Sequence, residues 1–493
     1  MVEYEDFGTR FSAELVAKII GGLSSGLLLI GLARLLQPDG YGLLFLAISI
    51  LGILQLASRL GIAKSTARYI AEYRSTDPPQ IPHIVNTGVI LNLLAIASVA
   101  FPLLLGHRLL ADLIGEPALV PYLLVGVGYV VAGTLTYFVR TLLQGFEAID
   151  WAAGVYILHR GSRLLFAVGI VLLGYGGVGA LVGYVLANVL ATVFGLTVLV
   201  TFYRRQGSAQ NIEAGLRRRI GEYAVPLTAT RAASVLDSRV DKVLIGFFLT
   251  PASVGFYTIA AQLVEFVTIL SSALGFTLSP TLGTTVAEGN RQKASRLFEE
   301  TLTYSLLVYV PLGAGLALVA NPLIELLFGA EYLDAVPVLR LFGAYVVFRS
   351  ITKLTSNALN FLGRAREIAV AKGITAVLNV GLNVLLIPTL GIVGAALAMV
   401  CTFGGYTATT LYIMQDELNL RAGYLATRVG KILLITGTMS LIVYGLLDFV
   451  TGAITLGIVV TSGIFVWFTL GVAGNMIQAS QIRNVLPSRD RKE

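Results

Sequence analysis

The sequence contains few charged residues and almost no cysteine or histidine. Lys, Arg, Asp and Glu make up 13% of its 493 residues, whereas soluble domains carry roughly 25%. The single cysteine, Cys401, excludes an internal disulfide and a cysteine-based metal cluster. The three histidines, at positions 83, 107 and 159, share no metal-ligand spacing. We therefore expect no metal site.

Motifs of catalysis and of nucleotide binding are also lacking. No P-loop, HExxH or GxSxG motif is found in the context that each requires. The segment GYGGVG at 174–179 has the form GxGxxG, but it lies between two apolar runs, so we expect a tight turn between membrane spans there. The net charge of +7 falls mainly between apolar runs, where membrane topology accounts for it. We expect no catalytic residue, no cofactor and no nucleic-acid partner.

Long apolar segments dominate the sequence instead. Hydrophobic residues make up 56% of the chain, and the mean hydropathy is +0.81. A helix needs about 20 mainly apolar residues to cross a membrane. Segments of that length fall at about 13–36, 40–60, 84–106, 119–143, 151–174, 178–203, 223–250, 253–278, 301–320, 336–361, 367–388, 391–414, 427–449 and 452–476. The sequence thus predicts an all-α integral membrane protein with about 14 transmembrane helices.

Two pairs of matching segments indicate an internal repeat. LLQPDGYGLLFLA at 35–47 aligns with FLTPASVGFYTIA at 248–260, and GYGGVGALVG at 174–183 aligns with TLGIVGAALA at 389–398. Spans 1–6 and 7–12 are therefore two parallel, pseudo-symmetric copies of one six-helix unit. We expect an N-lobe at 1–205, a basic cytoplasmic linker at 206–222, a C-lobe at 223–415, an additional helix pair at 427–476 and a polar cytoplasmic tail at 477–493.

Lysine and arginine lie mostly on one side of the predicted membrane. Of the 35 Lys and Arg residues, 30 fall on the side of the two termini. The longest opposite loop, at about 321–335, carries three acidic residues and no Lys or Arg. By the positive-inside rule, both termini are cytoplasmic. The lack of a targeting sequence favours the plasma membrane.

Charges inside predicted spans are the strongest functional signal. Residues 231–250 are apolar enough to cross a membrane, yet they include Asp237, Arg239, Asp241 and Lys242. A charge at membrane depth costs roughly 3 kcal/mol on insertion scales, so these residues should face protein or water. At about 100° per residue, the aspartates share one side of the helix and the cations lie nearly opposite. We expect Arg239 and Lys242 to bind an anionic substrate and the aspartates to balance charge or to couple transport.

Glu265, on the next span, is a candidate partner for Arg239. The two residues lie at similar depth, about 20 Å below the outer surface. They form either a structural ion pair or part of a cationic cavity wall, with Glu265 as a coupling carboxylate. At the repeat offset, Arg239, Lys242 and Glu265 correspond to Gly26, Leu29 and Gly52. Because the first copy lacks these charges, we favour the functional interpretation.

Other charged residues lie near the ends of spans. Glu14 and Lys18 have i, i+4 spacing in the first span and form either a cavity gate or an interfacial helix start. Arg34 and Arg340 suit an outer rim that steers phosphate, although snorkelling explains either one alone. We expect most of the cytoplasmic-end cations to contact lipid headgroups and some to catch a phosphate. These cations are Arg59, Arg140, Arg160, Arg163, Arg349 and Lys353.

Three segments resemble a known transporter family. ARLLQPDGYGLLFLA (33–47) and LGIAKSTARYIAEY (60–73) resemble polysaccharide-biosynthesis flippases of the Wzx/RfbX type, and SRVDKVLIGFFLTPASVGFYTIA (238–260) is typical of their second lobe. This family is a branch of the multidrug/oligosaccharidyl-lipid/polysaccharide (MOP) exporter superfamily. The resemblance implies alternating access around a central cationic cavity. The implied cargo is a polyprenyl- or dolichyl-(pyro)phosphate-linked glycan. Membrane lipids, and glycosyltransferases and a polymerase or ligase of the same pathway, are the implied partners.

The sequence leaves three other functions open. A cation-coupled small-molecule or multidrug exporter of the same superfamily usually has twelve spans, so the added pair at 427–476 counts against it. A membrane glycan polymerase or ligase generally needs a large outer loop, whereas the longest here has about 15 residues. The third alternative is a non-transporting scaffold for glycan assembly.

Overall fold

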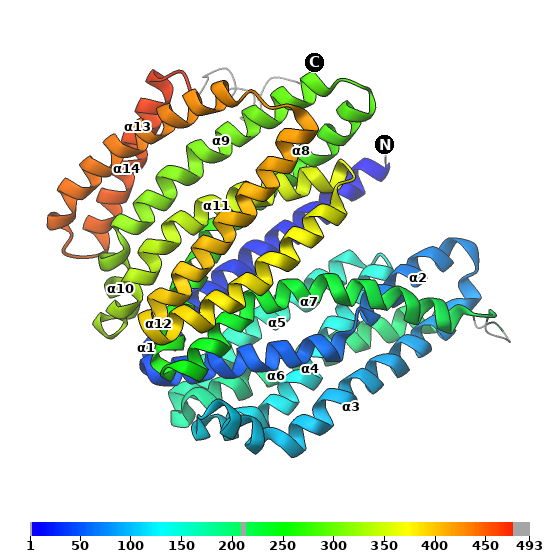
Figure 1. Cartoon of the computed structure of the whole chain (residues 1–493). Helices are drawn as coiled ribbons and strands as arrows, with labels where there is room; N and C mark the ends of the chain where they lie inside the picture. Colours follow the sequence, from blue (N-terminus) through cyan, green and yellow to red (C-terminus); the bar gives the residue numbers. More distant parts are fainter. Residues whose placement is uncertain (1, 208, 210–212, 477–493) are drawn as a thin grey trace. The chain divides into compact units, whose positions relative to one another are not determined.

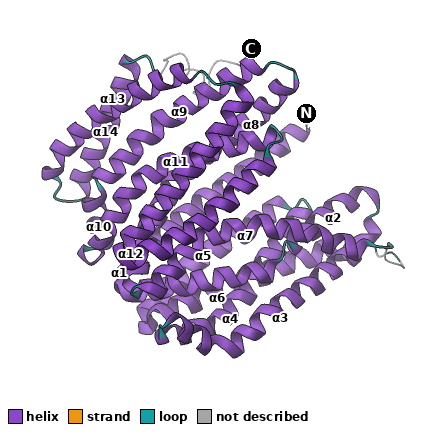
Figure 2. Cartoon of the chain, viewed as in Figure 1, coloured by secondary structure: helices purple, strands orange, loops and turns teal. Residues whose placement is uncertain are grey.

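The computed structural model describes residues 2–207, 209 and 213–476, and within these ranges the chain is helical and has no strand (Figures 1 and 2). Helices form because the membrane interior offers no water to backbone polar groups, and a helix satisfies those groups within one segment. The long helices are α1 (Val2–Arg59), α2 (Ile62–Thr76), α3 (Ile81–Ile114), α4 (Val120–Gly145), α5 (Ile149–Ile170), α6 (Gly176–Arg204), α7 (Leu216–Phe248), α8 (Pro251–Ala287), α9 (Arg291–Leu318), α10 (Ala320–Phe328), α11 (Val336–Phe361), α12 (Ala365–Leu418), α13 (Ala422–Leu446) and α14 (Ala453–Ala473). The all-α prediction is confirmed.

The predicted spans correspond to these helices, some of which hold two spans. Nine segments of the described chain are long and apolar enough to cross a membrane, and three of them, Gly21–Arg59, Ile149–Arg204 and Ala365–Leu418, contain two predicted spans each. Breaks separate the two spans inside these segments. α1 breaks at Gln37, just before Pro38, and α12 breaks at Gly391. Helices α7 and α8 correspond to the remaining two predicted spans.

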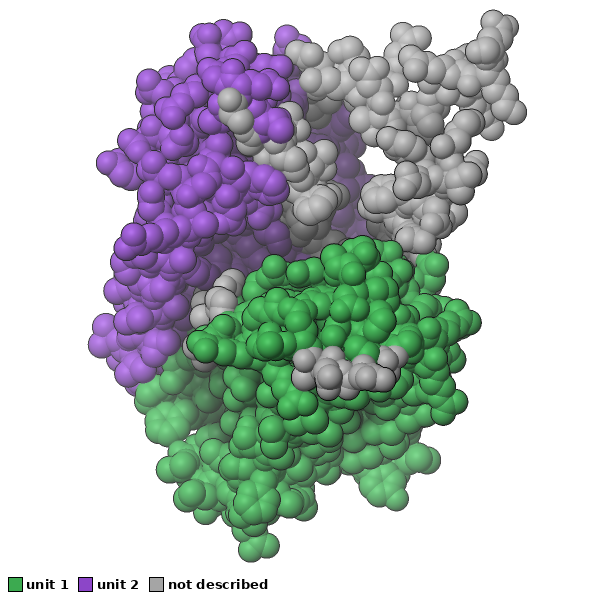
Figure 3. Space-filling view, turned by 90° about the vertical axis from the view of Figure 1, so that its right-hand side faces the viewer, with its two compact units in different colours: residues 1–258 green, residues 259–493 purple. Residues whose placement is uncertain are grey.

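The chain divides into two compact units, Met1–Thr258 and Ile259–Glu493 (Figure 3). This division falls later than the predicted lobe boundary at 222/223, because α7 packs with the first half of the chain. Ser65 Oγ on α2 donates a hydrogen bond to the Ile220 carbonyl on α7, at 2.6 Å. Ahead of α7, Glu213 accepts a hydrogen bond from Tyr73, and this bond lowers the pKa of the carboxyl. The predicted tail at 477–493 lies outside the described residues.

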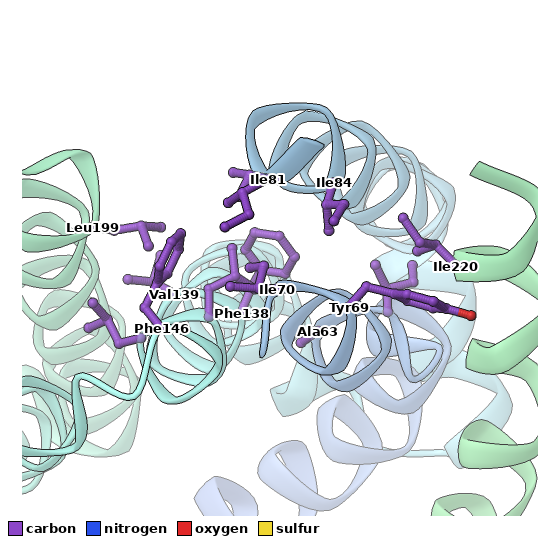
Figure 4. Packing of buried hydrophobic residues seen from close by; sticks show 14 of the residues in the cluster. Ala63, Tyr69, Ile70, Ile81, Ile84, Phe138, Val139, Phe146, Leu199 and Ile220 are labelled. Carbon is purple, nitrogen blue, oxygen red and sulfur yellow. The ribbon is translucent and has the colours of Figure 1, made fainter. Parts of the chain in front are cut away.

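A hydrophobic core joins α2, α3, α4 and α7 in the first unit. Ile70, Ile81, Ile84 and Ile220 are fully buried, and Phe138 is almost so. Figure 4 shows these side chains pointing toward one another from the surrounding helices. Burial of a large apolar side chain contributes about 1.5–3 kcal/mol in water. This core explains why the start of α7 belongs to the first unit.

In the second unit, the additional helix pair is anchored to α9. The Glu299 carboxylate on α9 is fully buried and accepts hydrogen bonds from the backbone N–H and the Nε of Arg421, at 2.6 and 2.9 Å. Arg421 directly precedes α13. On α14, Trp467 Nε1 donates to the Leu307 carbonyl of α9, at 2.8 Å. α13 and α14 are therefore an integral part of the second unit.

The backbone repeats its conformation at positions that the sequence repeat matches. Gly176, which follows a π-helical segment at Val171–Tyr175, has φ 56° and ψ −150°, and its match Gly391 has φ 61° and ψ −143°. Only glycine adopts this region readily. Both residues form the tight turn between two spans, as predicted for GYGGVG. The repeat is thus visible in the structure as well as in the sequence.

The two copies of the repeat also contact each other near Pro38 and Pro251, through the matched glycines Gly42 and Gly255. A Cβ added to Gly42 would lie 1.7 Å from the Pro251 carbonyl oxygen, and one added to Gly255 would lie 2.8 Å from the Pro38 carbonyl oxygen. The sequence match pairs Pro38 with Pro251 and Gly42 with Gly255, so the contact is reciprocal. Within the first unit, the backbones of the two turns are therefore in direct contact. A side chain at either glycine would prevent this contact.

Candidate functional site

Asp241, one of the charged residues of the predicted site, is buried and accepts a hydrogen bond. Asp241 is 2% exposed, and Tyr257 on α8 donates a hydrogen bond to its Oδ2 at 2.8 Å. Tyr257 is buried as well. A buried carboxylate needs such donors because leaving water is costly. The bond joins α7 to α8 across their turn, so Asp241 has a structural role beside any role in coupling.

Arg239 reaches α1. Its Nη1 donates to the Ile48 carbonyl at 2.8 Å, and the guanidinium lies where a Cβ on Gly52 would be, 2.8 Å from Cζ. Gly52 is the position that matches Glu265 in the first copy of the repeat. The missing side chain at Gly52 therefore makes room for Arg239.

The predicted partner of Arg239, Glu265, has another partner in its own unit. Arg349 Nη2 on α11 lies 3.0 Å from Glu265 Oε1, and Arg349 also lies over the Tyr345 ring at 5.9 Å. The Glu265 side chain is 69% exposed and that of Arg349 is 29% exposed. The structure thus gives Arg239 and Glu265 separate contacts, one in each unit.

The remaining predicted residues lie on several helices of the two units. Lys242 is half-buried on α7, and Arg34 and Arg340 are exposed on α1 and α11. The side chains of Glu14, Lys18 and Asp237 lie outside the described residues. In the part of the chain that the structure describes, no group of three His, Cys, Asp or Glu side chains is placed to hold a metal ion.

Four arginines that the sequence placed at cytoplasmic span ends form a cluster in the first unit. We call it the arginine–tyrosine cluster, because each guanidinium lies over a tyrosine ring. Its residues are Arg59 over Tyr137 at 4.7 Å, Arg140 and Arg160 over Tyr156 at 4.7 and 5.2 Å, and Arg163 over Tyr184 at 5.1 Å. Helices α1, α4, α5 and α6 contribute to it. Each stacked pair contributes about 0.5–2 kcal/mol.

Ser25 on α1 joins two of these arginines. Arg160 Nη1 and Arg163 Nη2 both donate to its Oγ, at 3.1 and 3.3 Å. The two guanidinium groups therefore meet at a single oxygen atom. All four arginines of the cluster also act electrostatically on the His159 imidazole, which lies beside Arg160 on α5. Charges inside spans are costly and generally functional, so this cluster is a candidate binding site.

No carboxylate of the described residues lies within salt-bridge distance of Arg160 or Arg163. Their Nε atoms are buried and have no hydrogen-bond partner in that part of the chain. An arginine carries five N–H donors in a planar fork, and that fork matches the oxygens of a phosphate. With their faces toward tyrosine rings, these guanidinium groups keep N–H edges for an anion. The cluster therefore has the chemistry of a phosphate site.

The spacing of tyrosine and arginine in the sequence is a feature of this cluster that the positions of the charges alone do not reveal. Tyr156 and Arg160 have i, i+4 spacing, and Arg160 and Arg163 have i, i+3 spacing, so all three share one face of α5. Tyr137 and Arg140 repeat the pattern on α4. The spacing thus places a tyrosine and an arginine one turn apart on each of these two helices.

Comparison with known families assigns the chain. The model of the polysaccharide biosynthesis protein family matches residues 10–286, more than half of the sequence. The chain belongs to this family. A second family model, MatE, matches residues 226–385. The polysaccharide biosynthesis family match covers the whole arginine–tyrosine cluster.

Individual relatives agree with this assignment. The probable low-salt glycan biosynthesis flippase Agl15 of Haloferax volcanii is 24% identical over 482 residues, covering 96% of this chain and 97% of that protein. The solved structure of the lipid II flippase MurJ in an inward closed conformation covers 93% of this chain and 97% of its own, with a TM-score of 0.75 at 15% identity. An inward-facing MATE family transporter of the MOP superfamily covers 85% of this chain and 98% of its own, with a TM-score of 0.66 at 17% identity. The MOP exporter-like fold predicted from the sequence is confirmed.

Proposed function

We propose that this member of the polysaccharide biosynthesis protein family flips a lipid-linked oligosaccharide across the plasma membrane and catalyses no bond formation. The cargo is a glycan on a polyprenyl or dolichyl (pyro)phosphate. The observation that carries the proposal is the arginine–tyrosine cluster, in which Arg160 and Arg163 meet at Ser25 and keep Nε atoms without a partner among the described residues. Agl15, a relative named a probable low-salt glycan biosynthesis flippase, aligns with 96% of this chain and supports the same function.

In this proposal the cluster holds the phosphate while the lipid tail stays in the bilayer. Arg160 and Arg163 bind the phosphate oxygens directly, since Ser25 fixes them beside each other. Arg59 and Arg140 add positive charge that favours the anion. Lys242 is a further substrate contact, and Arg34 and Arg340 form an outer rim that the phosphate meets last. Alternating access then exposes the headgroup to one leaflet at a time.

The orientation of the protein follows from its charges. We propose that both termini are cytoplasmic, since 30 of the 35 Lys and Arg residues fall on that side. Glycosyltransferases on the cytoplasmic side would supply the cargo, and a polymerase or ligase outside would consume it. Arg239 stays a candidate substrate contact beside Lys242. Asp237, Asp241, Glu265, Glu14 and Lys18 stay candidates for charge balance and coupling.

Reconstitution tests this function. The purified protein is incorporated into liposomes with a fluorescent lipid-linked oligosaccharide, and a membrane-impermeant quencher reports how much label reaches the outer leaflet. We expect fast equilibration between the leaflets with protein and slow equilibration without it. Mass spectrometry of the recovered lipid should show an unchanged glycan.

Other outcomes of this assay would support one of the three alternative functions. A change in glycan mass would contradict the proposal in favour of a polymerase or ligase. Export of a cationic dye, without movement of the lipid-linked glycan, would favour the multidrug exporter that the MatE match suggests. If neither substrate moves, the scaffold is the better account.

A further inference from the structure

One aromatic ring of the arginine–tyrosine cluster lies under two cations. The Tyr156 side chain is half-buried on α5, and its ring centre lies 4.7 Å from the Arg140 guanidinium of α4 and 5.2 Å from the Arg160 guanidinium of α5. Among the described residues, each of the other two tyrosine rings in the cluster carries one guanidinium. The negatively charged face of an aromatic ring attracts cations, which offsets part of the repulsion between like charges. Tyr156 is therefore where cations of two helices meet.

Small residues of α1 make room for this ring. A Cβ added to Gly21 would lie 2.7 Å from Tyr156 Cε1 and 2.8 Å from its hydroxyl oxygen, so a side chain there would displace the ring. One turn later, Ser25 Oγ accepts a hydrogen bond from Arg160 Nη1 and donates one to the Gly21 carbonyl, at 3.1 and 2.7 Å. Tyr156 and Arg160 are also one turn apart. The two helices thus run side by side here, with Gly21 against the tyrosine and Ser25 against the arginine.

The contact with the ring restricts how the two arginine side chains move. A guanidinium over a ring is held by its face, so its N–H edges stay available to an anion. A long arginine side chain otherwise samples many rotamers and loses that freedom when it binds a phosphate. A side chain that is already held loses less conformational entropy, so the phosphate binds more tightly. Tyr156 can therefore strengthen phosphate binding without contacting the phosphate.

We propose that Tyr156 is a positioning residue of the phosphate site, that the face of its ring holds Arg140 and Arg160 ready for the anion, and that Gly21 leaves the space which this ring needs. This inference rests on the proposed function. It assigns the effect to the electron density of the ring face, and not to the hydroxyl group or to the volume of the side chain. Phenylalanine should therefore replace tyrosine at this position, and leucine should not.

A series of substitutions at position 156 separates the effect of the ring face from that of packing. Tyr156 is replaced by leucine, by phenylalanine and by phenylalanines with one, two or three ring fluorines, which withdraw electron density from the ring face and hardly change its size. For each protein we would measure the affinity for geranyl phosphate in detergent and the flipping rate of the lipid-linked oligosaccharide in liposomes. The same series at Tyr412, an exposed residue of α12, is the control.

We expect Tyr156→Phe to retain most of the affinity and of the flipping rate, and each added fluorine to lower both. Tyr156→Leu should lower both by about tenfold, the change that corresponds to 1.4 kcal/mol. The series at Tyr412 should change neither. Gly21→Ala should resemble Tyr156→Leu, because its methyl group displaces the ring. Gly22→Ala, whose added Cβ has no heavy atom within 4 Å, should match the wild type.

Three results would overturn this inference. If Tyr156→Leu binds and flips like the wild type, the ring has no role at the site. If Tyr156→Leu is impaired but the fluorinated rings match phenylalanine, the residue acts through packing alone. A wild type that binds no geranyl phosphate overturns the phosphate site itself. The proposed function fails separately: affinity for geranyl phosphate would then still fall with each fluorine, while the wild type flips no lipid-linked oligosaccharide.

Discussion

At the scale of single residues, burial separates structural charges from functional ones. Asp241 and Glu299 are almost fully buried, and each has close hydrogen-bond donors. Arg160 and Arg163 share only a serine hydroxyl among the described residues and keep buried Nε atoms without a partner there. A buried charge with hydrogen-bond partners stabilises the packing of helices. A buried charged group without such partners is costly, so it is a candidate binding site.

Tyr257→Phe should therefore destabilise the protein. The substitution removes the 2.8 Å bond to Asp241 and leaves a buried oxygen without that donor. We expect a loss of about 1–3 kcal/mol, seen as a lower midpoint of thermal unfolding in detergent. Tyr444→Phe, at an exposed position on α13, is the matched control and should leave the midpoint unchanged. Equal midpoints for both variants would mean that the bond contributes nothing.

At the scale of helices, the break points and close contacts are set by glycine and proline. Gln37–Pro38 interrupts α1, and Gly391 interrupts α12 at the position matched to Gly176. The reciprocal approach of Gly42 to Pro251 and of Gly255 to Pro38 joins the two copies of the repeat. Among the described glycines, Gly42 has the least room for a side chain, since an added Cβ would lie 1.7 Å from the Pro251 carbonyl oxygen.

Gly42→Ala is the sharpest test of that contact. The added methyl group would lie 1.7 Å from the Pro251 carbonyl oxygen, which is backbone and cannot rotate away. We expect a loss of about 1–3 kcal/mol from overpacking, measured as a lower unfolding midpoint. Gly22→Ala, also in α1, has no heavy atom within 4 Å and should be neutral or stabilising. A Gly42→Ala protein as stable as the Gly22→Ala protein would refute the close approach.

Sequence reasoning predicts the helices better than the site. Apolar run length and Gly and Pro placement predict the spans, the GYGGVG turn and the repeat, because these depend on local chemistry. The partners of the charges depend on packing between distant helices. Neither the contact of Arg239 with the Ile48 carbonyl nor that of Glu265 with Arg349 follows from depth alone. For the same reason, the start of α7 was predicted as part of the linker at 206–222, whereas Ile220 packs in the core of the first unit.

At the scale of the whole molecule, the two units carry different cations within their spans. The first unit has guanidinium groups over tyrosine rings, and the second has Lys372 Nζ over the Phe403 and Tyr406 rings. Charges within spans are costly and generally functional, so each group is a candidate contact for a polar part of the cargo. A lipid-linked glycan has such parts, a phosphate and a sugar chain.

The central claim is that the arginine–tyrosine cluster binds the phosphate of the transported lipid. The most direct measurement is the flipping rate of a labelled lipid-linked oligosaccharide in liposomes that contain Arg160→Gln/Arg163→Gln. We predict a rate lower by at least about tenfold, because a hydrogen bond to a charged group contributes about 1.5–3 kcal/mol. Arg217→Gln, an exposed arginine at the start of α7, should flip at the wild-type rate. A folded double variant that flips as fast as wild type would contradict the account.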